Sequence, residues 1–302
     1  MTDRRRTLAD RLGDGASRAA FDSTDWALLL TVSGIFGSAF LWISIALRSL
    51  EPGVIAVGRL VLAAGAIVLI PRARRRIDRA DWAIVAIAGL IGQGAPAYLF
   101  AAAEKHISSA LTGMLVAGVP IIATAISVGI TRRRPGRFQV GGLAIGLVGM
   151  VMLAGPDLVE AGGSALGVGM VLVAVCCYAV SNNLYPRVAQ TYGSLPISLW
   201  GQALSAIVLL PVGIADLSGS RVEPLPIVAL VILGVVGTGI ARALLVTLVG
   251  RVGPRRAPVM SYLIPVVALV LGVAVLGESV TALQVAGVAV AMAGGFLVTR
   301  AE

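Results

Sequence analysis

An internal repeat limits the folds open to this chain more than any other feature. The stretch from Gly89 to Gly149 recurs, without a gap, 145 residues later. Glycine is common, at 37 of 302 residues, so one glycine match means little, but a proline and a glutamine match in the same register. The chain is therefore internally duplicated, on seven matched pairs: Gly89/Gly234, Gly92/Gly237, Gly94/Gly239, Pro120/Pro265, Gln139/Gln284, Gly142/Gly287 and Gly149/Gly294.

The composition is that of a membrane protein. Hydrophobic residues make up 58% of the chain and charged residues 13%, and the charges fall in short runs between long apolar stretches. A helix needs about 20 apolar residues to cross a hydrocarbon core, whereas a β-barrel needs short alternating strands. The sequence predicts ten membrane helices, at about 26–47, 54–70, 82–103, 108–130, 138–155, 166–187, 196–217, 226–248, 257–276 and 281–299.

Arginine placement predicts the orientation of these helices. With both termini in the cytoplasm, 19 of the 24 basic residues lie in cytoplasmic segments. The outer loops hold only Arg48, Lys105 and Arg221, and two more arginines lie within helices. Basic residues favour the cytoplasmic side of a membrane. This bias also accounts for the net charge of +9 without any nucleic-acid partner.

Each half of the chain supplies five helices, so the two halves enter the membrane from opposite sides. We expect a first repeat over 25–155 and an inverted second repeat over 164–300, related by an axis in the membrane plane. Such architecture is typical of transporters and places a substrate site near the midplane, between the halves. Residues 1–24 are polar and charged and are predicted to form a disordered cytoplasmic tail.

Glycine and proline interrupt equivalent helices of the two halves. Because such residues weaken the backbone hydrogen bonds of a helix, paired interruptions point to a binding site. The glycines alone would favour close helix packing, whereas their clustering with Gln93, Pro96 and Thr238 favours a cavity. Kinks at the prolines could be hinges or static bends. The hinge candidates are Gly92, Gly94, Pro96, Pro120, Gly237, Gly239 and Pro265.

Polar and aromatic side chains within the predicted helices are candidates for lining that cavity, since facing lipid is costly for a polar group. Aromatic faces and amide groups together suit an amphipathic solute. Trp42 and Trp200 could instead lie in interfacial belts, and Asn182 and Asn183 could join helices for about 0.6 kcal/mol each. The predicted substrate-binding residues are Trp42, Gln93, Tyr98, Tyr178, Asn182, Asn183, Trp200, Gln202, Thr238, Arg242 and Tyr262.

Two arginines lie inside predicted helices. Arg59 and Arg242 could each anchor a carboxylate, or could extend to the nearby interface. For Arg59 the structural role is favoured, and for Arg242 both interpretations stay open. The repeat counterpart of Arg242 is Ala97, so this charge is an asymmetric addition to a symmetric frame.

Acidic groups and catalytic motifs are missing from the predicted membrane interior. All fifteen acidic residues fall in tails, loops or helix edges, which argues against a proton-for-drug exchanger that needs a buried carboxylate. The sequence offers no metal-ligand, paired-acid or nucleophile arrangement. An intramembrane enzyme and a non-transporting scaffold are therefore weaker hypotheses than a transporter, and no cofactor or metal is expected.

Several local patterns resemble one transporter family. They are Gly37-Ser38-Ala39-Phe40 in the first helix, Arg59-Leu60 with Ala63-Ala64 in the second, the mid-helix prolines, and Leu276-Gly277-Glu278 followed by Gln284-x-x-Gly287. With ten helices in two halves, they resemble the EamA-type exporters of the drug/metabolite transporter superfamily. The resemblance covers nearly the whole chain after residue 25.

The resemblance implies alternating-access export of small metabolites across the bacterial inner membrane, with amino acids as the expected solutes and facilitated efflux as the simplest mechanism. A proton-coupled multidrug exporter is the alternative. The expected partners are a small-molecule substrate and the lipid bilayer, and the chain would act as a monomer or a homodimer. Glycines in the fifth and tenth helices, at Gly142-x-x-x-Gly146 and Gly294-Gly295, could pack within or between subunits.

Overall fold

The computed structural model describes residues 22–131, 136–159, 163–252 and 260–300. Six helical segments in this part of the chain are apolar and at least 18 residues long, and four shorter apolar helices complete the set. These same residues contain no strand. The predicted all-α membrane fold with ten spans is confirmed.

Seven of the ten spans described are single helices and three are stacks of shorter helical pieces. The first half contains α2 (Ser23–Ala46), α3 (Pro52–Val68), the stack α4–η3–α5 (Trp82–Gly89, Leu90–Gly94, Ala95–Ala103), the stack α6–η4–α7 (Ser109–Leu115, Val116–Gly118, Val119–Thr131) and α8 (Arg137–Val159). The second half contains α9 (Gly163–Tyr192), α10 (Ser194–Ala215), the stack α11–η6–α12 (Pro224–Val231, Ile232–Ile240, Ala241–Val252), α13 (Met260–Leu276) and α14 (Ala282–Arg300).

The sixth span differs most from its predicted bounds. It continues to Tyr192, whereas the sequence predicted an end near residue 187. The reason is that the last turns of α9 are polar and give no apolar signal. Tyr192 ends the helix in a polar contact, donating a hydrogen bond to Asp81 (2.6 Å) and to Asp78 (3.0 Å). This contact fixes the segment between α3 and α4 against α9.

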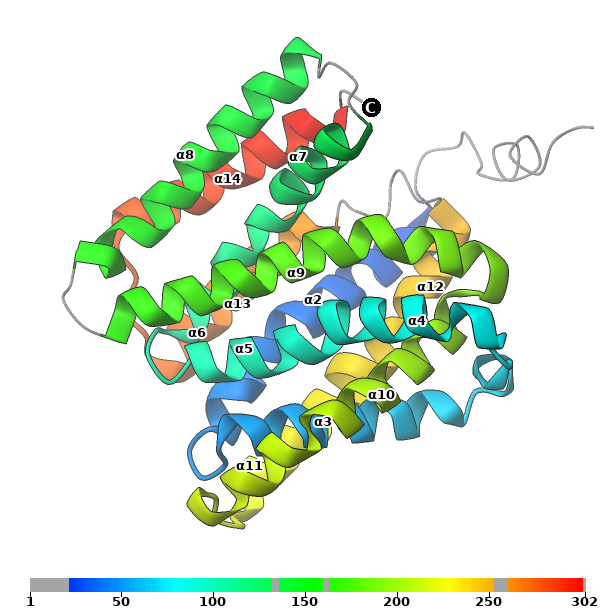
Figure 1. The fold of residues 1–302 in the computed structure, drawn as a ribbon. Coiled ribbons are helices and arrows are strands. Elements are labelled where there is room, and N and C mark those ends of the chain that lie inside the picture. Colours follow the sequence, from blue (N-terminus) through cyan, green and yellow to red (C-terminus); the bar gives the residue numbers. More distant parts are fainter. Residues whose placement is uncertain (1–21, 132–135, 160–162, 253–259, 301–302) are drawn as a thin grey trace, which may run out of the picture.

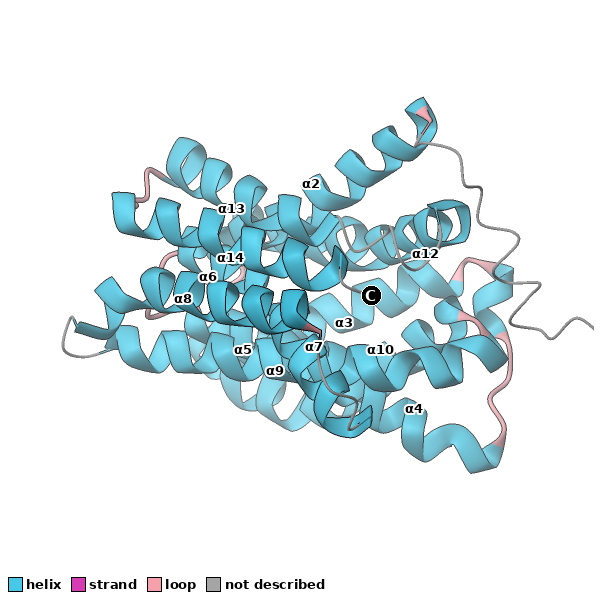
Figure 2. Ribbon diagram, turned by 90° about the horizontal axis from the view of Figure 1, so that it is seen from above, coloured by secondary structure: helices cyan, strands magenta, loops and turns pink. Residues whose placement is uncertain are grey.

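The two halves run in opposite directions through the bundle. In Figure 1, α2 starts at the end of the bundle where α9 finishes. The packing repeats in the same inverted way, because α2 packs against α13 as α9 packs against α7, and α3 packs against η6 as α10 packs against η3. The pairs α3–α10 and α8–α14 join equivalent helices of the two halves. Figure 2 shows the same bundle from above, with helices alone forming its body.

Glycine residues bring α8 and α14 into backbone contact. A Cβ on Gly149 would collide with the backbone of Ala291 and Gly287, and one on Gly294 would collide with the backbone of Gly146 and Gly142. Gly149 and Gly294 are repeat mates, so the close approach is symmetric. Small residues are what allow membrane helices to come this close. These glycine faces are therefore buried within one chain.

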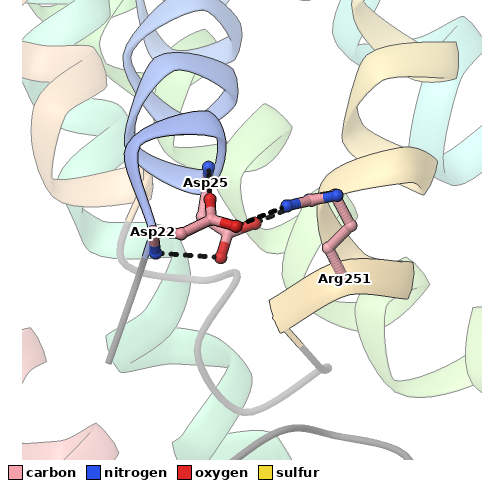
Figure 3. A network of polar contacts seen from close by, with 3 residues as sticks. All are labelled: Asp22, Asp25 and Arg251. Carbon is pink, nitrogen blue, oxygen red and sulfur yellow. Dashed lines mark hydrogen bonds and ion pairs between the residues drawn. The ribbon is translucent and has the colours of Figure 1, made fainter. Parts of the chain in front are cut away.

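Polar contacts hold each end of the bundle. At the end that carries the start of α2 and the end of α14, here called the arginine-rich end, Arg251 of α12 binds Asp25 (2.6 Å) and Asp22 (2.9 Å), as Figure 3 shows. Asp22 and Asp25 also cap the start of α2 reciprocally. At the opposite end, the Glu278 carboxylate accepts hydrogen bonds of 2.8 Å from two backbone N–H groups at the start of α6.

Candidate functional site

The third and eighth spans change from α-helix to π-helix at equivalent places. These wider turns are η3 at Leu90–Gly94 and η6 at Ile232–Ile240. Glycines in both segments weaken the helix, and Pro96 cannot donate the backbone bond that an α-helix requires there. The interruptions predicted from the repeat therefore exist in the structure. Widened turns of this kind occur often at functional sites.

The prolines of the fourth and ninth spans behave differently from one another. Pro120 is the second residue of α7, directly after the short helix η4, so the fourth span changes helix type there. Pro265 lies inside α13, which continues through it. Repeat-related prolines thus have unequal local structures. Their role as hinges stays a prediction.

A central cavity lies between the halves as two adjacent lobes that share four lining residues. The larger, polar lobe has a volume of about 190 Å³ and the smaller, apolar lobe about 80 Å³. Seven spans line them, four from the first half and three from the second, and Phe36, Val116, Tyr178 and Ile264 belong to both lobes. The polar lobe adds Gly92, Gln93, Val119, Ser181, Asn182, Arg242, Leu245, Met260 and Ser261, and the apolar lobe adds Ala39, Phe40, Ile43, Arg59 and Phe100.

The cavity opens toward the arginine-rich end. Lining residues of the polar lobe nearest that end, such as Met260 and Leu245, are half-buried, and Asn182 is exposed. Lining residues of the apolar lobe, such as Ile43 and Phe100, are buried. Phe100 packs edge-on against Phe40, with ring centroids 5.5 Å apart. The apolar lobe is therefore the closed end of the cavity.

Two polar groups of the polar lobe lack internal partners. The Nε of Arg242 is buried and makes no hydrogen bond to the described residues, and neither does the amide oxygen or nitrogen of Gln93. An unpaired buried polar group costs about 1–3 kcal/mol, more if charged. Both groups therefore keep unused hydrogen-bonding capacity in the wall of the cavity. Together they offer a cationic donor and an amide.

Arg59 has a structural partner at the closed end. Its Nε donates a 2.7 Å hydrogen bond to the hydroxyl of Thr238, and the residue is only 7% exposed. Thr238 in turn donates to the carbonyl oxygen of Leu233. This chain of bonds joins α3 to η6. The contact agrees with the structural role favoured for Arg59 and shows that Thr238 is already occupied.

Near this end, Glu104 is the one acidic residue among those described whose carboxyl oxygens are buried without a hydrogen-bond partner. It directly follows α5. Burial raises the pKa of the Glu104 carboxyl well above its usual range; Glu278 raises it further, and Arg59 opposes the shift. The sequence placed Glu104 in an outer loop beside the exposed His106, which gave no sign of this burial.

Of the predicted substrate-binding residues, four line the cavity: Gln93, Tyr178, Asn182 and Arg242. Two others make internal hydrogen bonds instead. The amide nitrogen of Asn183 donates to the carbonyl oxygens of Ala179 (2.9 Å) and Ala123 (3.2 Å), which joins α9 to α7. Thr238 binds Arg59, as described above.

The remaining five lie outside the two lobes. Trp42 packs against the main apolar core, and Tyr98 packs against a cluster between α3, α5 and α10. Tyr262 packs edge-on against Phe296 of α14. Trp200 packs edge-on against Trp82, and Gln202 is fully buried within α10. The seventh span therefore lines neither lobe, and for these residues contact with substrate has no geometric support.

The sequence did not single out Phe36, Ser181 or Ser261, which line the polar lobe. The repeat contained a signal for one of them. Ser261 lies 145 residues after Val116, and Ile264 lies 145 residues after Val119. All four line the cavity, so applying the offset to the fourth span would have located its partner face on the ninth. Because these repeat-related residues of the two halves line the same cavity, the approximate symmetry axis passes through it.

Comparison with known proteins assigns the fold to a family. The model of the EamA-like transporter family matches residues 25–155 and again residues 165–300. The chain belongs to the EamA-like transporter family. It is a multi-pass membrane exporter and not an enzyme.

Curated relatives of this EamA-family chain match most of its length. A probable terminal-alkyne amino-acid exporter of Streptantibioticus cattleyicolor is 27% identical, over 91% of this chain and 93% of that protein. A probable amino-acid metabolite efflux pump of Salmonella typhimurium is 25% identical, over 90% and 94% respectively. One crystal structure superposes with a TM-score of 0.62 at 17% identity, over 92% of this chain and 96% of the other, which shows the fold alone.

Proposed function

We propose that this exporter moves small amphipathic amino acids out of the cytoplasm across the bacterial inner membrane, by alternating access of the central cavity. The observation that carries the proposal is that Arg242 and Gln93, each with an unpaired buried polar group, line one polar lobe that adjoins an apolar lobe. A carboxylate accepts a strong charge-assisted bond from a guanidinium. The amide of Gln93 offers a further bond to the polar end of the same solute.

The apolar lobe complements the other end of such a solute. Phe36 and Tyr178 stand between the lobes, and Phe40 and Phe100 close the far side. Binding pockets for small molecules combine apolar walls with a few placed polar groups in this way. The names of the two relatives, an amino-acid exporter and an amino-acid metabolite efflux pump, support the same solute class.

The structure corresponds to an inward-facing state if the arginine-rich end is cytoplasmic, as the arginine distribution favours. The packing suggests which parts move. One group comprises α2, α11–η6–α12 and α13, and its symmetry mate comprises α9, α4–η3–α5 and α6–η4–α7. Rocking these groups about the axis would close the cytoplasmic opening and expose the cavity on the outer side.

Facilitated efflux is the driving mechanism that fits the cavity. The described residues lining the two lobes include no carboxylate and no histidine. Arginine does not titrate at physiological pH, and tyrosine titrates near 10. The solute gradient would then drive the cycle, and liposomes loaded with substrate would show flux in either direction without a pH gradient.

Proton-coupled multidrug export is the second candidate, and the buried carboxyl of Glu104 is the observation that favours it. The two mechanisms differ in one measurement. A pH gradient imposed across liposomes would drive accumulation of solute against its own gradient only in the coupled mechanism. Glu104→Gln would abolish that accumulation while leaving equilibrating flux intact.

Efflux from proteoliposomes tests the proposed function. A panel of amino acids and cationic drugs would be compared for the wild type, Arg242→Gln and Arg242→Lys. We expect amino-acid flux in the wild type, a large loss in Arg242→Gln and partial retention in Arg242→Lys, because lysine keeps the charge. Flux of cationic drugs alone, equal in all three proteins, would contradict the assignment.

A further inference from the structure

A second hollow lies on the outer surface of the bundle, between α3 and α10. Its walls are Ala64, Gly65 and Val68 of α3 and Leu199, Trp200 and Ala203 of α10, and Arg74 lies at its end. Its volume of about 430 Å³ falls in the range of small-molecule sites. It is separate from the central cavity, because neither lobe of that cavity is lined by any of these residues. We call it the α3–α10 groove.

The two helices pack against each other along their length, and the groove lies on the outer side of this contact. Toward the closed end of the cavity, Gly53 packs against Val212 and donates its N–H to Asp216 (2.8 Å), and Gly213 packs against Val57. Toward the arginine-rich end the contact continues through the buried side chains of Ile67 and Leu199, while Gly65 faces outward. A Cβ on Gly65 would meet nothing within 4 Å. The groove therefore opens where α3 approaches the membrane surface.

The segment that follows α3 surrounds this opening with positive charge. It contains five exposed arginines, none of them in an ion pair with a described acidic residue: Arg72, Arg74, Arg75, Arg76 and Arg79. The two aspartates of the segment, Asp78 and Asp81, instead accept hydrogen bonds from the hydroxyl of Tyr192. The charge is thus left for an external anion.

Arg74 is fixed at the end of the groove. Its Nε donates a 2.6 Å hydrogen bond to the carbonyl oxygen of Val68, the last residue of α3. This bond leaves its terminal nitrogens free to bind a phosphate, which guanidinium groups do with two parallel bonds. On the other wall, the Nε1 of Trp200 donates to the carbonyl oxygen of Arg75, at 3.4 Å. Tryptophan, whose ring is apolar but carries one polar N–H group, is enriched at the level of the lipid headgroups.

We propose that the α3–α10 groove binds one anionic phospholipid, with an acyl chain between the helices and the phosphate on Arg74. The apolar walls fit the chain and the unpaired arginines fit the headgroup. Basic clusters beside membrane helices attract anionic lipid generally. The groove adds a defined place for the acyl chain. This place distinguishes a binding site from the general attraction of anionic lipid to a basic surface. The inference stands whatever solute the central cavity carries.

Quenching of tryptophan fluorescence by brominated lipid tests the site, because Trp200 forms part of its wall. The full-length protein would be reconstituted in phosphatidylcholine vesicles containing brominated phosphatidylglycerol or brominated phosphatidylcholine. We expect stronger quenching by the anionic lipid, and loss of the excess in Trp200→Phe. Equal quenching by the two lipids in the wild type would overturn the proposal.

Two substitutions separate the groove from the charge around it. Gly65→Leu fills the groove, and Arg74→Gln removes the charge at its end; both should abolish the preference for the anionic lipid. Gly129→Leu, at an exposed glycine near the same end with open space around it, and Arg72→Gln, outside the groove, are the matched controls and should keep it. If Gly65→Leu unfolds, Ala203→Leu fills the groove from the other wall. A preference unchanged in the filled variants would mean surface attraction only and would contradict the site.

Discussion

The third and eighth spans are built alike and carry different chemistry. Both widen into π-helix at matched glycines, in η3 and η6. The amide of Gln93 in the first has no hydrogen-bond partner among the described residues, whereas its repeat mate Thr238 is bound to Arg59. Ala97 is buried against α3, whereas its mate Arg242 faces the cavity. The comparison shows that the residues matched between the two repeats build the helical framework, here called the shared frame. The residues that differ between the repeats, here called unshared, determine what the cavity binds.

The largest expected effect comes from breaking the shared frame. Gly149→Leu should destabilise the protein by about 3 kcal/mol, at the upper part of the usual range for overpacking, because the backbone of α14 leaves no room for a side chain. Gly294→Leu should have the same effect on the other side of the axis. Thermal unfolding of the purified variants would measure both. Gly141→Leu, on the same helix with open space around it, is the control and should unfold like the wild type.

Removing the unshared charge should leave the frame intact and reduce function. Arg242→Gln should lower efflux of carboxylate-bearing solutes by about 10- to 100-fold, from a charged hydrogen bond of about 1.5–3 kcal/mol. Its unfolding temperature should stay near that of the wild type. Transport of amino acids at the wild-type rate would show that the guanidinium does not hold the solute.

Substitutions at two residues of the third span compare a side chain that lines the cavity with one that packs between helices. Gln93→Ala should lower flux about fivefold, because it removes a neutral hydrogen bond of about 1 kcal/mol. Tyr98→Ala should instead lower stability and leave the turnover of folded protein unchanged, since its ring packs outside the cavity. Flux would be normalised to folded protein in the membrane. A loss of turnover in Tyr98→Ala equal to that in Gln93→Ala would place both side chains on the substrate path.

The smallest effect concerns Glu104, which has no polar counterpart in the second half. Its carboxyl has a raised pKa in the folded state, so ionising it costs stability once the pH exceeds the unfolded value of about 4.3. Glu104→Gln should therefore be at least as stable as the wild type at neutral pH. The difference should vanish at pH values where the carboxyl is protonated in both states. The free energy of unfolding of both proteins would be measured across this pH range. A variant less stable than the wild type at neutral pH would contradict the burial of the Glu104 carboxyl.

The sequence was sufficient for features that depend on periodicity and repetition. Apolar length gave the ten spans, and matched glycines located both interruptions. Sequence could not say which way a polar side chain faces, because on a helix this depends on the neighbours in three dimensions. Asn182 and Asn183 are adjacent, yet Asn182 lines the cavity and Asn183 bonds to α7. Glu104 looked like a loop residue because its burial comes from distant segments.

Labelling of one residue in the polar lobe tests the central claim most directly. Ser261→Cys, in a protein whose Cys176 and Cys177 are replaced by alanine, places a thiol in the cavity near its opening. A membrane-impermeant thiol reagent should label it rapidly in inside-out vesicles and slowly in right-side-out vesicles, and a transported amino acid should slow the labelling. Rapid labelling from the outer side alone, or labelling that no transported amino acid slows, would contradict a cytoplasm-facing substrate cavity.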